Sequence, residues 1–157
     1  MYHGKERSWG SGVGMAESVV GRDAAQRIRA AGLRVTAARV AVWAALHARP
    51  HGSVADVARE LREAAPRNSV QTLYNVVNDL TRAGLLRRVE FPGSAVARYE
   101  TRVGDAHHHL QCTSCGRVVD IDCAHVRGDC LDAVGVPAGT VTSVEVVFRG
   151  TCADCAA

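Results

Sequence analysis

The sequence predicts an α+β protein with a helical first half and a small α/β second half. Three observations support this fold class. Residues 23–82 carry apolar side chains at helical spacing, in runs that begin with capping residues. Two short β-rich runs then flank a Pro-Gly turn. Residues 106–157 alternate apolar and polar side chains around Cys-x-x-Cys motifs.

Length and composition restrict the class of protein. A chain of 157 residues accommodates one ordinary domain or two small ones. No apolar run approaches the roughly 18 residues of a membrane span, and residues 1–21 lack the apolar segment of a signal peptide. We therefore expect a cytoplasmic protein, in which the six cysteines serve metal or redox chemistry rather than disulfides.

Charge is distributed unevenly along the chain. Residues 22–103 carry 14 Arg or Lys and 7 Asp or Glu, whereas residues 104–157 carry 3 and 7. A basic first half suits a polyanion, of which DNA is the usual one. An acidic second half that is rich in Cys and His suits cations.

Four helices are expected after a flexible extension over residues 1–22, which glycines interrupt. The expected caps are Asp23 for a helix to about Ala31, Thr36 for a second, Ser53 for a third that Pro66 ends, and Ser69 for a fourth before Gly84. The fourth helix should span Val70 to Arg82, because its apolar residues recur at the spacing of one helix face.

A β-hairpin should follow, with strands over Leu85–Glu90 and Ala95–Thr101. Capped helices followed by a basic hairpin describe a winged helix-turn-helix, and we expect this DNA-binding domain over residues 23–98. The fourth helix would be the recognition helix, because its polar residues can reach base edges or phosphates; they are Gln71, Thr72, Tyr74, Asn75 and Asn78. An ordinary amphipathic helix with a solvated polar face is the alternative.

The second half is predicted to be a small α/β domain over residues 106–157, after a hinge at 99–105. Strands are expected over 107–112, 117–121 and 141–148, with a helix over about 124–134. A short sheet of this kind has a free edge and often completes itself by pairing with a second copy. We therefore expect a homodimer.

The second half also contains two kinds of metal ligand. Four thiols in two Cys-x-x-Cys pairs are the ligand set of a closed tetrahedral zinc site; they are Cys112, Cys115, Cys152 and Cys155. The histidines at 107–109, with Glu100 and Asp120, form a harder cluster of nitrogen and oxygen donors. That cluster suits Fe(II) or Mn(II) better than structural zinc.

These motifs resemble the ferric-uptake-regulator (Fur) superfamily of metal- and peroxide-sensing repressors. The resemblance covers residues 23–156 and rests on GLRVT at 32–36, SVQTLYN at 69–75, HHHLQCTSCG at 107–116 and CADC at 152–155. The run RYETRVGD at 98–105, with the extra cysteines Cys123 and Cys130, is similar to the actinobacterial FurA/CatR branch, which is PerR-type. Members of that branch typically repress a catalase-peroxidase gene and their own.

The resemblance implies two metal sites. The four cysteines would hold a structural Zn(II). A regulatory Fe(II) or Mn(II) would be held by His51, Glu100, His107, His109 and Asp120, closing the hinge and spacing two recognition helices for an AT-rich palindromic operator. In a strand, His108 would point to the other face. A substitute site of His108, Asp122 and His125 is conceivable, because Arg127 stands where an acidic ligand is expected.

For DNA, the resemblance assigns a thymine contact to Tyr74 and a minor-groove contact to Arg34. Arg39, Gln71, Thr72 and Asn75 complete the expected DNA-binding set. Asp120 is the residue that peroxide sensors carry, whereas Glu100 departs from them, so peroxide sensing is favoured and iron- or zinc-responsive control of metal uptake is the alternative. Cys123 and Cys130 suit a redox role or simple packing.

Two other classes of protein compete with a repressor. A zinc hydrolase needs an open metal position and a nearby general base, and the chain has no HExxH-like motif. A metal-storage protein, or another zinc protein without DNA binding, would not need a basic winged helix. We therefore expect no enzyme.

Overall fold

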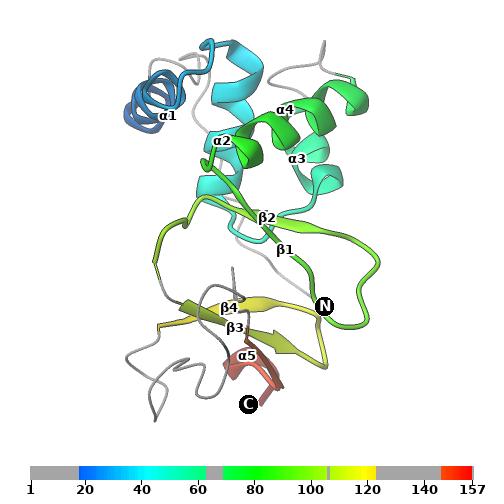
Figure 1. The fold of residues 1–157 in the computed structure, drawn as a ribbon. Coiled ribbons are helices and arrows are strands. Elements are labelled where there is room, and N and C mark those ends of the chain that lie inside the picture. The colour runs from blue at the N-terminus through cyan, green and yellow to red at the C-terminus, as the bar shows by residue number, and fades with distance from the viewer. Residues whose placement is uncertain (1–17, 63–68, 106, 123–145, 157) are drawn as a thin grey trace, which may run out of the picture. The chain divides into compact units, whose positions relative to one another are not determined.

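The computed structural model describes residues 18–62, 69–105, 107–122 and 146–156 (Figure 1). The helix expected over 124–134, with Cys123, Cys130 and His125, lies outside the described residues. Across the described residues, the helices are too short or too polar to cross a membrane. The chain forms two compact units: one runs to Val89 and includes Val96–Val103, and the other comprises Glu90–Ala95 with the residues from Gly104 onward. The domain boundaries expected from the sequence stay predictions.

The helices of the first unit begin at residues whose side chains accept a backbone hydrogen bond. They are α1 (Val19–Ala30), α2 (Ala37–Ala48), α3 (Val54–Glu60) and α4 (Val70–Arg82). Thr36, Ser53 and Ser69 cap α2, α3 and α4 as expected. Gly84, just past α4, adopts a left-handed backbone with φ of 69°.

The cap expected for the first helix is wrong. Ser18 caps α1, accepting from the Gly21 backbone N–H at 2.9 Å, so the helix begins several residues earlier than expected. Asp23 lies inside the helix and forms an ion pair with Arg27 one turn on, at 2.9 Å. Ser18 has an extended backbone, so its hydroxyl can accept from a free N–H group at the start of the helix. Asp23 lies inside the helix, where the backbone N–H groups already have partners.

The core of the first unit forms around α2. This helix contacts α1, α3 and α4, and in Figure 1 it lies between α1 and the α3–α4 pair. Its residues from Val40 to Leu46 are all buried. Leu73, Val77 and Leu80 line the inner face of α4, which leaves the polar face of that helix exposed.

The wing, residues 87–100, is a shorter hairpin than expected. Strands β1 (Arg87–Val89) and β2 (Arg98–Glu100) pair antiparallel, with Arg87 opposite Glu100. A backbone bond from Tyr99 N–H to the Gly52 carbonyl, at 3.0 Å, joins β2 to the α2–α3 turn. Residues Glu90–Ala95 do not extend the ladder, because the chain turns there: the Ser94 N–H donates to the Phe91 carbonyl at 3.0 Å, and Gly93 has a φ of 79°.

The second unit contains a three-stranded sheet in the order β4-β3-β5. Its elements are β3 (His107–Cys112), β4 (Val118–Asp122), β5 (Val147–Gly150) and the short helix α5 (Ala153–Ala156). β3 pairs antiparallel with β4 and parallel with β5. The strand expected over 141–148 is described only from residue 147 onward and runs on to Gly150.

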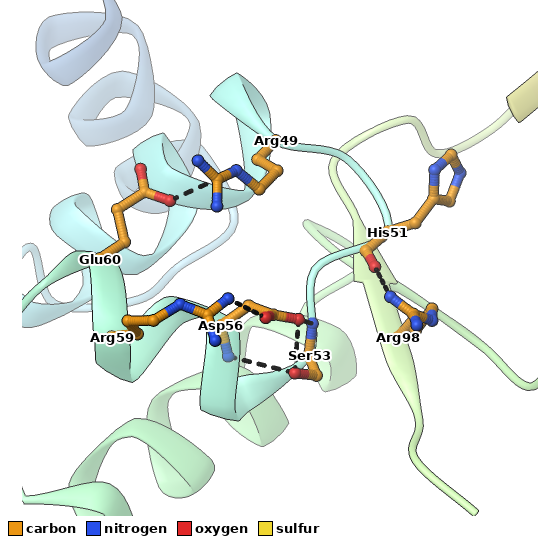
Figure 2. Close-up of polar contacts among 7 residues, drawn as sticks. All are labelled: Arg49, His51, Ser53, Asp56, Arg59, Glu60 and Arg98. Atoms are coloured by element: carbon orange, nitrogen blue, oxygen red, sulfur yellow. Dashed lines mark hydrogen bonds and ion pairs between the residues drawn. The ribbon is translucent and has the colours of Figure 1, made fainter. Parts of the chain in front are cut away.

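Asp56 completes a capping box at the start of α3 (Figure 2). Its carboxylate accepts from the Ser53 hydroxyl at 2.7 Å and from the Ser53 backbone N–H at 3.0 Å. These bonds, led by the hydroxyl, lower the pKa of Asp56 from 3.8 to about 2, and the neighbouring Arg59 adds to the effect. The ionised carboxylate therefore stabilises the folded state.

We predict that Asp56→Ala lowers the free energy of unfolding at neutral pH by about 1 kcal/mol, the usual value of a helix cap. Because folding lowers the pKa of Asp56, the difference in the free energy of unfolding between parent and variant should persist above pH 3.8. It should shrink as the pH falls toward about 2. Urea unfolding followed by circular dichroism at several pH values measures this. Asp23→Ala, which removes an exposed ion pair, is the control, and an equal loss in both variants would contradict the prediction.

Candidate metal centres and nucleic-acid interface

The four cysteines meet at one end of the sheet in the second unit. Their Sγ atoms all lie within 4.8 Å of one another. Parallel pairing of β3 with β5 places Cys112 opposite Gly150, and so brings the second Cys-x-x-Cys motif beside the first. The Thr113 backbone N–H donates to the Gly150 carbonyl at 2.8 Å, which fixes the turn between Cys112 and Cys115. The cluster expected from the sequence is therefore assembled.

The acidity of these thiols differs across the cluster. Backbone N–H groups, led by that of Cys152 at 3.4 Å from the Cys112 sulfur, lower the pKa of Cys112 to about 6. The sulfurs of Cys152 and Cys115 raise the pKa of Cys155 to about 12. One thiolate is thus stabilised, while further ones repel each other unless a divalent cation sits among them. Four clustered thiols of this kind fit a closed zinc site.

His51 and Glu100 form a buried pair in the first unit. The His51 Nε2 lies 2.9 Å from a Glu100 carboxylate oxygen, and the other carboxylate oxygen lies 3.7 Å from the Arg87 guanidinium. His51 has a φ of 61°, which is uncommon for a residue with a side chain. The Arg98 guanidinium donates to the His51 carbonyl at 3.0 Å and so stabilises this turn (Figure 2). Strained backbone of this type is characteristic of functional positions.

The second unit holds the other expected donors. His109 and Asp120 face each other across β3 and β4, with 3.7 Å between ring nitrogen and carboxylate. The rings of His107 and His109 lie 5.0 Å apart. His107 Nδ1 lies 2.9 Å from the Asp105 carboxylate, so the Asp105 contact orients the His107 ring.

His108 lies on the face of β3 opposite to that of His107 and His109, as the alternation of side chains along a strand predicts. Its ring meets that of Phe148 edge-on at 6.0 Å. Asp122 is opposite His107 in the ladder, and residues opposite one another share a face. The substitute site of His108 and Asp122 is therefore wrong for these two residues, because the sheet separates them.

Two residues beside the donors were not among the predicted ones. Asp105 precedes His107 by two positions, and that spacing in extended chain was the available signal. Phe91 packs edge-on against His109 at 5.5 Å between ring centroids. Nothing in the sequence pattern indicates that contact, because Phe91 and His109 belong to two separate segments of the second unit that come together only in the folded chain.

The exposed face of α4 presents most of the expected DNA-binding residues. Gln71, Tyr74, Asn75 and Asn78 are exposed, with Tyr74 at 47%. Thr72 is half-buried, and its hydroxyl lies 2.9 Å from that of the capping Ser69.

The two expected arginines differ in their surroundings. Arg34, in the loop before α2, is exposed. Arg39 has only 18% of its side chain exposed and forms an ion pair with Asp79 of α4.

A winged-helix unit followed by a sheet that carries thiol and His-carboxylate donors defines a metal-binding, DNA-binding regulator. The chain belongs to the ferric uptake regulator family, whose model matches residues 30–136. It is 44% identical over 133 residues to the transcriptional regulator FurA of Mycobacterium tuberculosis, a match that covers 85% of this chain and 90% of the relative. It is 32% identical over 135 residues to the ferric uptake regulation protein of Neisseria meningitidis, covering 83% of this chain and 92% of the relative.

Two solved structures have the same fold. The Vibrio cholerae ferric uptake regulator matches with a TM-score of 0.60 at 25% identity, covering 81% of this chain and 98% of that protein. The ferric uptake regulator of Pseudomonas aeruginosa with manganese matches with a TM-score of 0.61 at 25% identity, covering 87% of this chain and 99% of that protein. The predicted family and α+β fold are confirmed, and the relatives are transcriptional regulators rather than enzymes.

We predict that Cys152→Ser removes close to one zinc per chain and destabilises the second unit, because three thiolates leave the tetrahedron open. Zinc content by atomic emission and thermal unfolding measure the two effects. Cys123→Ser, which changes a cysteine other than these four, is the matched control. Full zinc retention in Cys152→Ser would contradict the assignment.

Proposed function

We propose that the protein is a metal-dependent repressor that binds AT-rich palindromic operators as a cytoplasmic homodimer. It would respond to peroxide and iron, and control oxidative-stress genes such as a catalase-peroxidase gene, together with its own gene. The observation that carries the proposal is the buried His51–Glu100 pair in the helical unit, in a chain whose sheet unit holds a second set of nitrogen and oxygen donors. A cation that binds both sets would couple metal supply to DNA binding.

The proposed regulatory site joins His51 and Glu100 to His107, His109 and Asp120. The donor set is nitrogen and carboxylate oxygen, which suits Fe(II) or Mn(II) and contrasts with the thiol set that suits zinc. A solved relative from Pseudomonas aeruginosa carries manganese, which is consistent with this assignment. Because the five donors come from both units, metal binding would favour the arrangement of the hinge, residues 99–105, that is competent for DNA.

Homodimer formation is supported by the exposed face of the sheet. Leu110 is opposite Val119 on one side and Phe148 on the other, so the three share a face. Val119 and Phe148 are each 37% exposed although apolar. A second copy placed on this sheet would cover them, and two recognition helices would then meet two operator half-sites.

Contacts to DNA are assigned to the exposed residues of the first unit. Tyr74 would contact thymine, and Arg34 would enter the minor groove of an AT-rich segment. Gln71, Thr72 and Asn75 would contact bases or phosphates near the start of α4. The Gln71 side chain donates to that of Asn75 at 3.2 Å, so the two present a joint polar surface.

An iron- or zinc-responsive repressor of metal uptake is the second candidate. The names of the relatives favour it, because several are ferric uptake regulation proteins. Asp120 favours peroxide sensing, and the rings of His107 and His109, whose centroids lie 5.0 Å apart, would give the oxidant two candidate targets in the second unit. Bound Fe(II) would supply the redox chemistry that Mn(II) does not.

Peroxide sensing predicts different behaviour for the two metals. Micromolar peroxide should release the Fe(II)-loaded protein from its own promoter and leave the Mn(II)-loaded protein bound. Gel shift follows the release, and peptide mass should show one added oxygen on His107 or His109. Release with disulfides at Cys123 or Cys130 would transfer sensing to the thiols, and no release would favour the uptake repressor.

We predict that His51→Asn weakens Mn(II) binding by about tenfold or more, because it removes a nitrogen donor. Asparagine tolerates the left-handed backbone found at residue 51, so the turn should survive. Calorimetric titration of the zinc-loaded protein measures the affinity. His47→Asn, which changes an exposed histidine stacked on Trp43, is the control. Equal Mn(II) affinity in both variants would exclude His51 as a ligand.

A further inference from the structure

Arg39 bridges two parts of the first unit that are separate in the sequence. Its Nη1 donates to the backbone carbonyl of Arg34 at 2.7 Å, and its Nη2 donates to the Asp79 carboxylate at 2.7 Å. Arg34 lies in the loop before α2, and Asp79 lies in the third turn of α4. A single guanidinium therefore holds the loop and the recognition helix at a set separation.

The surroundings of Arg39 do not suit a phosphate contact. Only 18% of its side chain is exposed, and the partner carboxylate already neutralises its charge. Both terminal nitrogens donate to acceptors of the protein itself. Arg34, by contrast, is exposed, and it contributes its backbone carbonyl rather than its side chain to the bridge.

We propose that Arg39 is a positioning residue for DNA recognition, and that Asp79 is its necessary partner. The bridge sets the spacing between the minor-groove residue Arg34 and the major-groove residues of α4, so that both grooves are read in one register. The inference rests on the proposed DNA binding and deepens it. It replaces the expectation that Arg39 contacts DNA directly.

The sign of one substitution separates positioning from simple electrostatics. Asp79→Ala removes a negative charge from the DNA-binding unit, and by charge alone it should tighten binding to a polyanion. If the carboxylate instead anchors Arg39, the same substitution loosens the Arg34 loop and weakens binding. A lysine at residue 39 keeps the positive charge, but a single ammonium lacks the fork that reaches two acceptors.

The experiment uses the full chain, loaded with zinc and Mn(II), and an operator selected from a pool of random duplexes. Affinity is measured for the parent, Arg39→Lys, Asp79→Ala, Asp79→Asn and the double variant across several salt concentrations. A second duplex replaces the A·T pairs flanking the major-groove contacts with G·C pairs. Asp23→Ala, which removes a carboxylate from the exposed pair with Arg27 on α1, is the matched control.

Arg39→Lys and Asp79→Ala should each weaken operator binding by about tenfold, and the double variant should be no weaker than either, because all three break one bridge. In these variants, the preference for the duplex with A·T flanks over the one with G·C flanks should fall together with the affinity. The dependence of affinity on salt concentration should stay unchanged. Asp79→Asn, which keeps an acceptor oxygen, should lose less. Asp23→Ala should bind like the parent or slightly more tightly.

Three results would overturn the positioning role. Tighter binding by Asp79→Ala would mean that the carboxylate acts by charge alone. Parental affinity in Arg39→Lys would show that the positive charge alone is sufficient at this position, as expected if Arg39 contacts a phosphate directly. Weaker binding with an intact A·T preference would mean a general structural role. A parent chain that selects no duplex would instead overturn the proposed function, and the bridge's role with it.

Discussion

A fully buried carboxylate, that of Glu100, links several parts of the first unit. Glu100 has none of its side chain exposed, and a charge in that position must be compensated. The structure places Arg87 on one carboxylate oxygen and His51 on the other. Register between β1 and β2 brings Arg87 opposite Glu100, and the left-handed turn at His51 brings its ring within reach. The wing, the turn and the candidate metal site therefore depend on one charge.

In the second unit, a single strand has a comparable role. One strand, β3, carries His107 and His109 on one face and ends at Cys112, so it serves both candidate metal sites. Its neighbour β4 supplies Asp120, and its other neighbour β5 leads to Cys152 and Cys155. A shift of register by one residue would move the histidines to the wrong face. Zinc held at the end of β3 would therefore also hold the register of the regulatory donors.

Much of this arrangement could be predicted from the sequence, because the local signals are strong. The caps at Thr36, Ser53 and Ser69 indicate three of the helices, and the two Cys-x-x-Cys motifs indicate the thiol cluster. The positive φ of His51, the partly buried ion pair of Arg39 and the contact of Phe91 with His109 were not predictable in this way. Each depends on segments that come into contact only after the chain has folded, and a local sequence pattern does not predict such contacts.

The parallel pairing of β3 with β5 has a consequence for the order of folding. Cys112 and Cys152 are 40 residues apart, and the entropic cost of closing such a loop must be met before the thiols can assemble. The helical unit also contains long-range contacts, such as Arg39–Asp79 and His51–Glu100, but its residues all precede Gly104, so it can form while synthesis continues. On the ribosome, the nascent chain would therefore carry a finished helical unit before its last cysteines emerge. Zinc binding by the four thiols would then be the last step in the folding of the newly made chain.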